Sequence, residues 1–205
     1  RFYDMAISHA DKTMANHFRP DYSCYHVVNY DTISGNALQK CTWQGYADKS
    51  VWSRGQSWGL YGYTMMYRET KQPRYLEQAK HIAGFLLNHP KMPQDKIPYW
   101  DFDDPDIPNA LRDASAAAIM ASALLELSGY VDEATGQGYV AVAETQLRTL
   151  ASDEYLAKPG ENTNFILKHS VGFLPQDSEV DVPLTYADYY FVEALMRYRA
   201  MCLKE

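Results

Sequence analysis

The sequence has few cysteines, no basic tract and no apolar run long enough to cross a bilayer. Its three cysteines, Cys24, Cys41 and Cys202, are widely spaced, and they predict neither a disulfide framework nor a zinc site. The longest apolar run, 116–125, is interrupted by Ser122 and is too short for a transmembrane helix. A net charge of −7 without a Lys/Arg cluster argues against nucleic acid or an anionic membrane surface as a partner.

What is present fits a globular protein with a sizeable core, because 46% of the residues are hydrophobic and 22% are charged. Trp43 and Gln44, followed by Arg54 and Trp58, gather in one short glycine-containing stretch. An indole face can stack on a sugar ring, while Gln and Arg offer planar hydrogen-bonding groups to hydroxyls or a carboxylate. The stretch is therefore a candidate binding site; the alternative is an aromatic plug at the end of a helical core.

Hydrophobic periodicity and helix start signals predict six helices joined by long loops. We expect them at 1–18, 55–70, from Pro73 onward, at 113–128, near 136–152 and from Thr185 onward, with a short strand or hairpin between Cys24 and Tyr30. The helices at 55, 113 and 185 follow loops rich in Trp, Asp, Arg and Tyr, and we expect them to be inner helices. The other three carry one apolar and one charged face, which is typical of outer helices. The fold class is therefore all-α, with three inner–outer pairs.

Several motifs resemble one enzyme family. The segment from Gly45 to Gly62 (GYADKSVWSRGQSWGLYG), together with RPDYS at 19–23, PYWDFD at 98–103, RDASAAA at 112–118 and EVDVPLTYADYY at 179–190, resembles the unsaturated glucuronyl hydrolases, glycoside hydrolase family 88. The resemblance covers nearly the whole chain. It implies an (α/α)6 toroid of which residues 1–205 supply about half the helices, namely the C-terminal half of a single catalytic domain whose upstream half is missing.

The resemblance implies an enzyme that removes a 4,5-unsaturated uronic acid from the non-reducing end of lyase-generated oligosaccharides. Such enzymes hydrate the C4–C5 double bond with an aspartate general acid/base. We expect no catalytic residue in this chain, because that aspartate would lie upstream of Arg1. His26, Gln44, Arg54 and Trp58 match substrate-binding positions, and His169 is a further pocket candidate. The expected partners are an unsaturated oligosaccharide and the missing half of the barrel, with no cofactor and no metal.

Two alternatives remain open at this point: an unsaturated rhamnogalacturonyl hydrolase, and a non-catalytic sugar-binding or scaffold protein that lacks the acid. The acidic stretch 101–106 is similar to a calcium loop, but Pro105 occupies a ligand position and the closing Glu is missing. We therefore expect a solvated acidic loop there. Asp113 is expected to cap a helix and Arg112 to pair locally. Because the sequence opens at Arg1, it does not distinguish a periplasmic from a cytoplasmic location.

Overall fold

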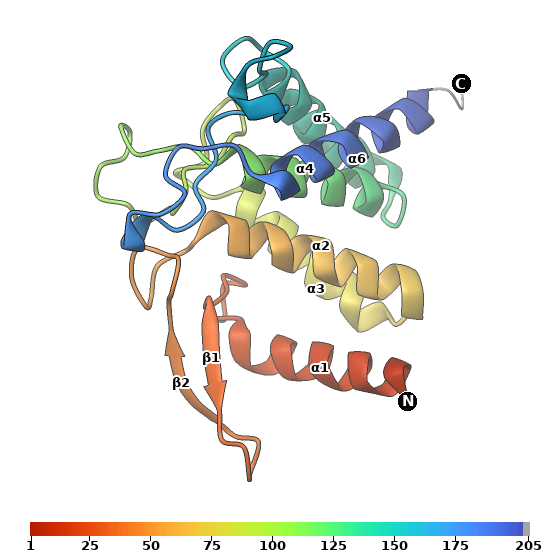
Figure 1. Cartoon of the computed structure of the whole chain (residues 1–205). Coiled ribbons are helices and arrows are strands. Elements are labelled where there is room, and N and C mark those ends of the chain that lie inside the picture. Colours follow the sequence, from red (N-terminus) through yellow and green to blue (C-terminus); the bar gives the residue numbers. More distant parts are fainter. Residues whose placement is uncertain (203–205) are drawn as a thin grey trace.

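The structure, a computed structural model, describes residues 1–202 of the chain and contains six α-helices in that range. Figure 1 shows their arrangement. The elements are α1 (Phe2–His17), β1 (Val27–Tyr30), β2 (Ala37–Cys41), α2 (Ser53–Thr70), α3 (Pro73–Leu87), α4 (Ala114–Ser128), α5 (Glu133–Leu150) and α6 (Thr185–Cys202), with short 3₁₀ turns at Asn162–Asn164 and Leu174–Gln176. All six helices predicted from the sequence are confirmed, although α2 and α5 begin two or three residues earlier than expected.

Helices α2, α4 and α6 lie side by side in one layer, and α3 and α5 form a second layer behind them (Figure 1). The Ala-rich α4 sits in the middle of the first layer, and nearly all of its side chains are buried. Its small side chains let neighbours approach on several sides at once. Helix α3 packs against α2 and α5 against α4, each through one apolar stripe. This confirms the predicted inner and outer roles for these five helices.

Helix α1 lies at the edge of this assembly, and its only buried side chain is Ala10. The Tyr63 hydroxyl of α2 donates a hydrogen bond of 2.9 Å to the Ala10 carbonyl. Asp11 also pairs with Arg74 and accepts a hydrogen bond from Tyr75, both on α3. Helix α1 is thus joined to its neighbours by these polar contacts and by Ile7, Ala10 and Met14, which pack with the core, while its other apolar side chains are largely exposed.

A strand between Cys24 and Tyr30 is confirmed as β1, and it pairs with a second strand, β2, that the sequence did not predict: the two are antiparallel, and Val27 pairs with Cys41. The chain then runs from β2 into α2, which brings residues 42–46 beside His26. The loops before α2, α4 and α6 meet at one end of the layer, where single bridges join Trp52 to Asp101 and Ser170 to Val182. The fold therefore gathers the Trp-, Asp- and Arg-rich loops at the N-terminal ends of the three inner helices.

One sequence expectation needs correction. The acidic stretch 101–106 is only partly solvated, because Asp103 and Asp106 are exposed but Asp101 and Asp104 are buried. Asp101 accepts hydrogen bonds from the Ser50 hydroxyl and the Tyr46 amide, and burial raises the pKa of its carboxyl group. Within residues 1–202, no helix is long and apolar enough to span a membrane.

Candidate functional site

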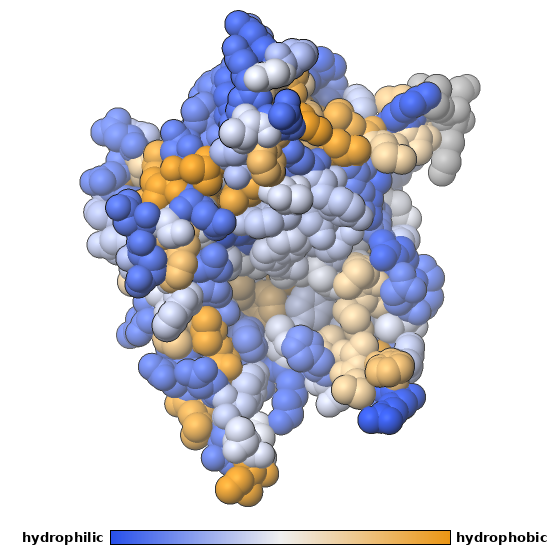
Figure 2. All heavy atoms as spheres, in the orientation of Figure 1, coloured by the Kyte–Doolittle hydropathy of each residue, from blue (hydrophilic) through white to orange (hydrophobic). Residues whose placement is uncertain are grey.

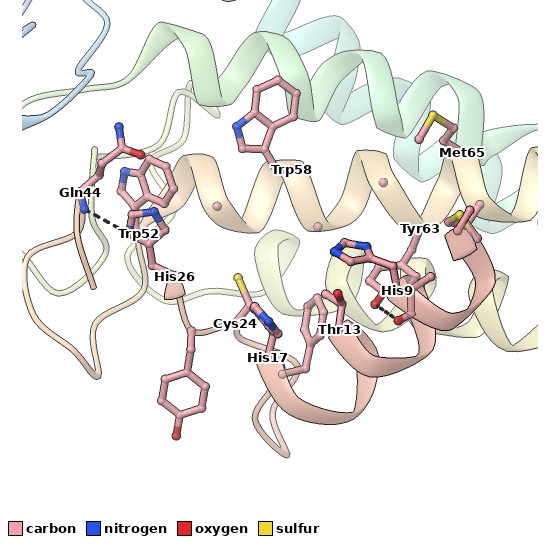
Figure 3. Close-up of a pocket in the computed structure, with 18 residues that line it drawn as sticks. His9, Thr13, His17, Cys24, His26, Gln44, Trp52, Trp58, Tyr63 and Met65 are labelled. Carbon is pink, nitrogen blue, oxygen red and sulfur yellow. Dashed lines mark hydrogen bonds between the residues drawn. The ribbon is translucent and has the colours of Figure 1, made fainter. Parts of the chain in front are cut away.

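A groove of about 700 Å³ runs between α1 and α2 and extends to the hairpin. Figure 2 shows the surface hollowed between α1 and the helices above it, and Figure 3 shows the lining side chains. His26, Gln44, Trp52 and Trp58 line one end of the groove, while Gly62, Met65 and Met66 of α2 line the other. A volume of this size is typical of small-molecule sites. Three of the four predicted substrate-binding residues, His26, Gln44 and Trp58, are thus brought together.

His26 is held as a neutral ring. Its Nδ1 atom accepts hydrogen bonds from the backbone amides of Trp43 and Gln44, at 3.0 and 3.1 Å. Burial, followed by the nearby positive charge of Arg54, lowers the pKa of His26 to about 4. Because Nδ1 is occupied as an acceptor, the ring hydrogen is on Nε2. His26 can therefore donate a hydrogen bond from Nε2 but does not carry a positive charge near neutral pH.

Gln44 is oriented by a loop far away in the sequence. Its Nε2 atom donates a hydrogen bond of 2.9 Å to the Gly172 carbonyl. The amide oxygen is then the free polar atom of the side chain, and Figure 3 shows it on the side of Trp52. Gln44 therefore offers the groove a hydrogen-bond acceptor.

Arg54 does not line the groove. Its side chain is 2% exposed, and Nη1 forms an ion pair of 3.0 Å with Asp113. The same guanidinium donates to the carbonyls of Val171 and Gly172. Its polar contacts are therefore with protein acceptors, and the predicted contact between Arg54 and substrate stays a prediction. Asp113 caps α4 as expected, accepting from the Ser115 amide, but its pairing with Arg54 is a second role that the sequence did not reveal.

Two indoles belong to the apolar part of the groove wall, together with Phe18, Tyr63, Met65 and Met66. Trp58 is partly exposed and packs edge-on against Tyr190, with ring centroids 5.0 Å apart. Trp52 was not among the predicted site residues, although it begins the motif that contains Arg54 and Trp58. Its ring lies 4.3 Å from that of His26, and its buried Nε1 has no acceptor among residues 1–202. The groove therefore presents aromatic surface, while the Trp52 indole N–H stays buried behind it.

His169 lies elsewhere. Its Nδ1 is 2.7 Å from Asp181 Oδ1, its ring packs edge-on against Tyr155, and it does not line the groove. The structure thus does not bring this predicted pocket residue to the others, because Asp181 holds it on the loop before α6. Arg112 pairs with Asp95, as the expected local ion pair. No group of three potential metal ligands occurs within the described part of the chain.

No carboxylate lines the groove among the described residues. The buried Asp101 and Asp113 are both bonded to protein donors, and His26 is neutral. The described residues can therefore bind a ligand through aromatic surface, the Gln44 amide oxygen and the Nε2–H of His26, but they place no carboxylic acid in the groove.

Comparisons with known proteins agree with this picture, although no protein-family model matches the chain. An unsaturated glucuronyl hydrolase of Formosa agariphila is 50% identical over 203 residues, which are 99% of this chain and 50% of the relative. An unsaturated glucuronyl hydrolase of Bacillus sp. GL1 is 36% identical over 199 residues, which are 94% of this chain and 51% of the relative. The chain thus spans about half the length of these curated relatives.

Solved structures show the same relationship. The crystal structure of an unsaturated glucuronyl hydrolase specific for heparin matches with a TM-score of 0.95 and 60% identity, covering 98% of this chain and 53% of that one. The enzyme of Bacillus sp. GL1 matches with a TM-score of 0.88 and 34% identity, covering 96% of this chain and 52% of that one. The fold is therefore that of an (α/α)6 toroid, with about half of its helices present here. The chain belongs to the unsaturated glucuronyl hydrolases, glycoside hydrolase family 88.

Proposed function

We propose that residues 1–205 are the C-terminal half of a single (α/α)6 catalytic domain. Both terminal helices carry apolar side chains that face outward: Phe2 and Met5 of α1 are 82% and 58% exposed, and Tyr189 and Met196 of α6 are 60% and 67% exposed. The apolar side chains on α6 are visible in Figure 2. Exposed apolar patches of this kind are typical of surfaces that another part of the protein covers. The upstream half of the barrel is the occupant we propose for them.

The far end of the groove also fits a helix of that upstream half. Gly55, Gly59 and Gly62 occupy one face of α2, at a spacing of one helical turn, and all three line the groove. An added Cβ at Gly62 would meet no atom within 4 Å, whereas at Gly55 it would meet the Trp52 ring at 2.8 Å and at Gly59 the Phe18 ring at 3.3 Å, so this face is uncovered at Gly62. Small residues at such a spacing permit close helix–helix approach. A neighbouring inner helix seated there would leave the His26 end of the groove open for a ligand.

The proposed activity is the removal of a 4,5-unsaturated uronic acid from the non-reducing end of a lyase-generated oligosaccharide, by hydration of the C4–C5 double bond. The observation that carries this proposal is the groove wall of His26, Gln44, Trp52 and Trp58 in a chain that is 50% identical to an unsaturated glucuronyl hydrolase. The indoles supply stacking surface, while His26 and Gln44 supply a donor and an acceptor for sugar hydroxyls.

The proton donor in this proposal comes from the upstream half. Protonation of the double bond and activation of water need a group that exchanges a proton near neutral pH. His26, with its pKa lowered to about 4, is not protonated there, and no carboxylate of the described residues lines the groove. The other two histidines of the lining, His9 and His17, lie on α1, and the family resemblance gives the acid/base role to an aspartate. We assign substrate binding to this half and acid/base catalysis to an aspartate of the other half.

Among the possible substrates, we place heparin-derived disaccharides first. The structural relative at 60% identity is specific for heparin, whereas a streptococcal unsaturated chondroitin disaccharide hydrolase is 34% identical. Initial rates on unsaturated disaccharides from heparin, chondroitin and hyaluronan, measured with the full-length protein, test this order. A higher kcat/KM on a chondroitin disaccharide would reverse it.

The assignment of the groove is tested by Trp58→Ala in the full-length protein. Loss of a stacking platform of roughly 1–3 kcal/mol should raise KM for the unsaturated disaccharide by roughly 5- to 150-fold. Trp43→Ala is the matched control, because Trp43 is 67% exposed and does not line the groove. Unchanged kinetics in Trp58→Ala, or equal losses in both variants, would contradict the assignment.

A further inference from the structure

A continuous series of hydrogen bonds leads from the start of α4 to the groove. Asp113 pairs with Arg54 Nη1 at 3.0 Å, and Arg54 Nη2 donates a hydrogen bond of 2.8 Å to the Gly172 carbonyl. The same carbonyl accepts a second hydrogen bond, of 2.9 Å, from Nε2 of the Gln44 side-chain amide. Arg54 and Asp113 are 2% and 0% exposed. Four residues from separate segments are thereby connected, and only Gln44 among them lines the groove.

Because the Gly172 carbonyl can only accept, the hydrogen bond between it and Gln44 decides which polar atom of the Gln44 side chain faces the ligand. A carbonyl oxygen only accepts hydrogen bonds, so the atom of Gln44 that meets Gly172 must be the NH₂ group. If the Gly172 carbonyl moved away, the Gln44 amide could rotate and present its NH₂ group to the groove instead. The position of this carbonyl therefore sets the polarity of the groove wall at Gln44.

Arg54 is well suited to fix that carbonyl. Its planar guanidinium reaches two successive carbonyls, those of Val171 and Gly172, and a lysine could not span both in this way. Asp113 in turn fixes the guanidinium, while its other oxygen accepts from the Ser115 amide at the start of α4. The loop before α6 is thus held against the N-terminal ends of α2 and α4.

We propose that Asp113 and Arg54 are positioning residues, whose ion pair holds the Gly172 carbonyl so that Gln44 presents its amide oxygen to the groove. Together with the Nε2–H of His26, this oxygen forms a neighbouring acceptor and donor, which matches a hydroxyl group better than a carboxylate. The inference about the ligand rests on the proposed function, whereas the inference about the orientation of Gln44 does not.

The orientation is tested by the side-chain amide resonances of Gln44 in the full-length protein, assigned from their disappearance in Gln44→Ala. A protected, downfield-shifted NH₂ proton is expected in the wild type, because it is bonded to Gly172. Asp113→Asn should shift this resonance and increase its hydrogen exchange. Glu126→Gln is the matched control, since it weakens an ion pair between α2 and α4 at their opposite ends, where Arg68 meets Glu126 at 2.9 Å. An unmoved Gln44 resonance in Asp113→Asn, or an equal shift in Glu126→Gln, would overturn the proposal.

Steady-state kinetics of the same variants provide a second test of the proposal. Asp113→Asn should raise KM by about 3–10-fold with kcat little changed, and the effect should vanish in a Gln44→Ala background. A merely structural role would give the same fold-change in both backgrounds, and that result would overturn the proposal. If Asp113→Asn fails to fold, Arg54→Lys is used in its place for both the resonance measurement and the kinetics, with the same expected results. A full-length protein without activity would contradict the proposed function, while the resonances would still decide the orientation of Gln44.

Discussion

Gly62→Ala tests whether the groove between α1 and α2 holds a helix of the proposed upstream half. Gly62 lies within α2 with a negative φ, and alanine there would meet no atom within 4 Å in the described structure. Considered only within this chain, the substitution should stabilise the helix by roughly 0.5–1 kcal/mol, because alanine loses less conformational entropy than glycine on folding.

In the full-length protein the expected sign is reversed. A helix packed onto α2 at Gly62 would contact the added methyl group, and overpacking of a close helix contact costs about 1–3 kcal/mol. The net effect of Gly62→Ala should then be a loss of up to about 2 kcal/mol in the free energy of unfolding. The measurement is urea unfolding of the full-length protein, followed by tryptophan fluorescence.

Gly138→Ala is the matched control for this experiment. Gly138 is an exposed glycine within α5, which like α2 has 18 residues, and an added Cβ there also meets nothing within 4 Å. It should stabilise the full-length protein by the helix-propensity gain alone, roughly 0.5–1 kcal/mol. If Gly62→Ala stabilises the full-length protein as much as Gly138→Ala does, the groove is open at Gly62. The proposal that a helix of the upstream half packs against α2 there is then refuted.

Two further predictions concern the buried polar groups. Because the pKa of His26 is lowered to about 4 in the folded state, the unfolded chain binds its proton first as the pH falls, so the stabilisation is complete above about pH 6.5 and is lost between there and about pH 4. The urea midpoint should therefore fall less between about pH 7 and pH 5 in His26→Gln than in the wild type, and an equal fall would contradict the assignment of a neutral His26. Arg54→Met should destabilise the protein by about 3–5 kcal/mol in urea unfolding, because it leaves the buried Asp113 carboxylate unpaired. Adding Asp113→Asn should restore part of this loss, and a single variant as stable as the wild type would refute the account of the ion pair.

The helices were predictable because their signals are local. Pro73 stands at the first turn of α3, Asp113 caps α4, and an apolar stripe marks each outer helix. Weak alternation between Cys24 and Tyr30 predicted β1 but not its partner strand β2, and the family resemblance named His26, Gln44 and Trp58, which the structure places along one groove. Sequence patterns of this kind report which residues share a face of one element or one loop, and for these residues that was sufficient.

The parts that could not be predicted depend on contacts between distant segments. Arg54 and Asp113 are 59 positions apart, and nothing in either local pattern identifies the other as its partner. Asp101 looked solvated because acidic loops usually are, but Ser50 and Tyr46 supply donors that make its burial tolerable. Trp52 precedes α2 immediately, and only the packing of the hairpin against it shows that its N–H is buried at the groove.

The most direct test of the account follows the absorbance of the 4,5-unsaturated uronate in three samples: the full-length protein, residues 1–205 alone, and residues 1–205 mixed with the upstream half. The account predicts decay of the absorbance with the full-length protein and with the mixture, and none with residues 1–205 alone, because this half binds substrate and the other half supplies the proton donor. Decay with residues 1–205 alone would contradict the account and would require a general acid within this chain. A full-length protein that leaves the absorbance unchanged on all three disaccharides would contradict the proposed activity itself.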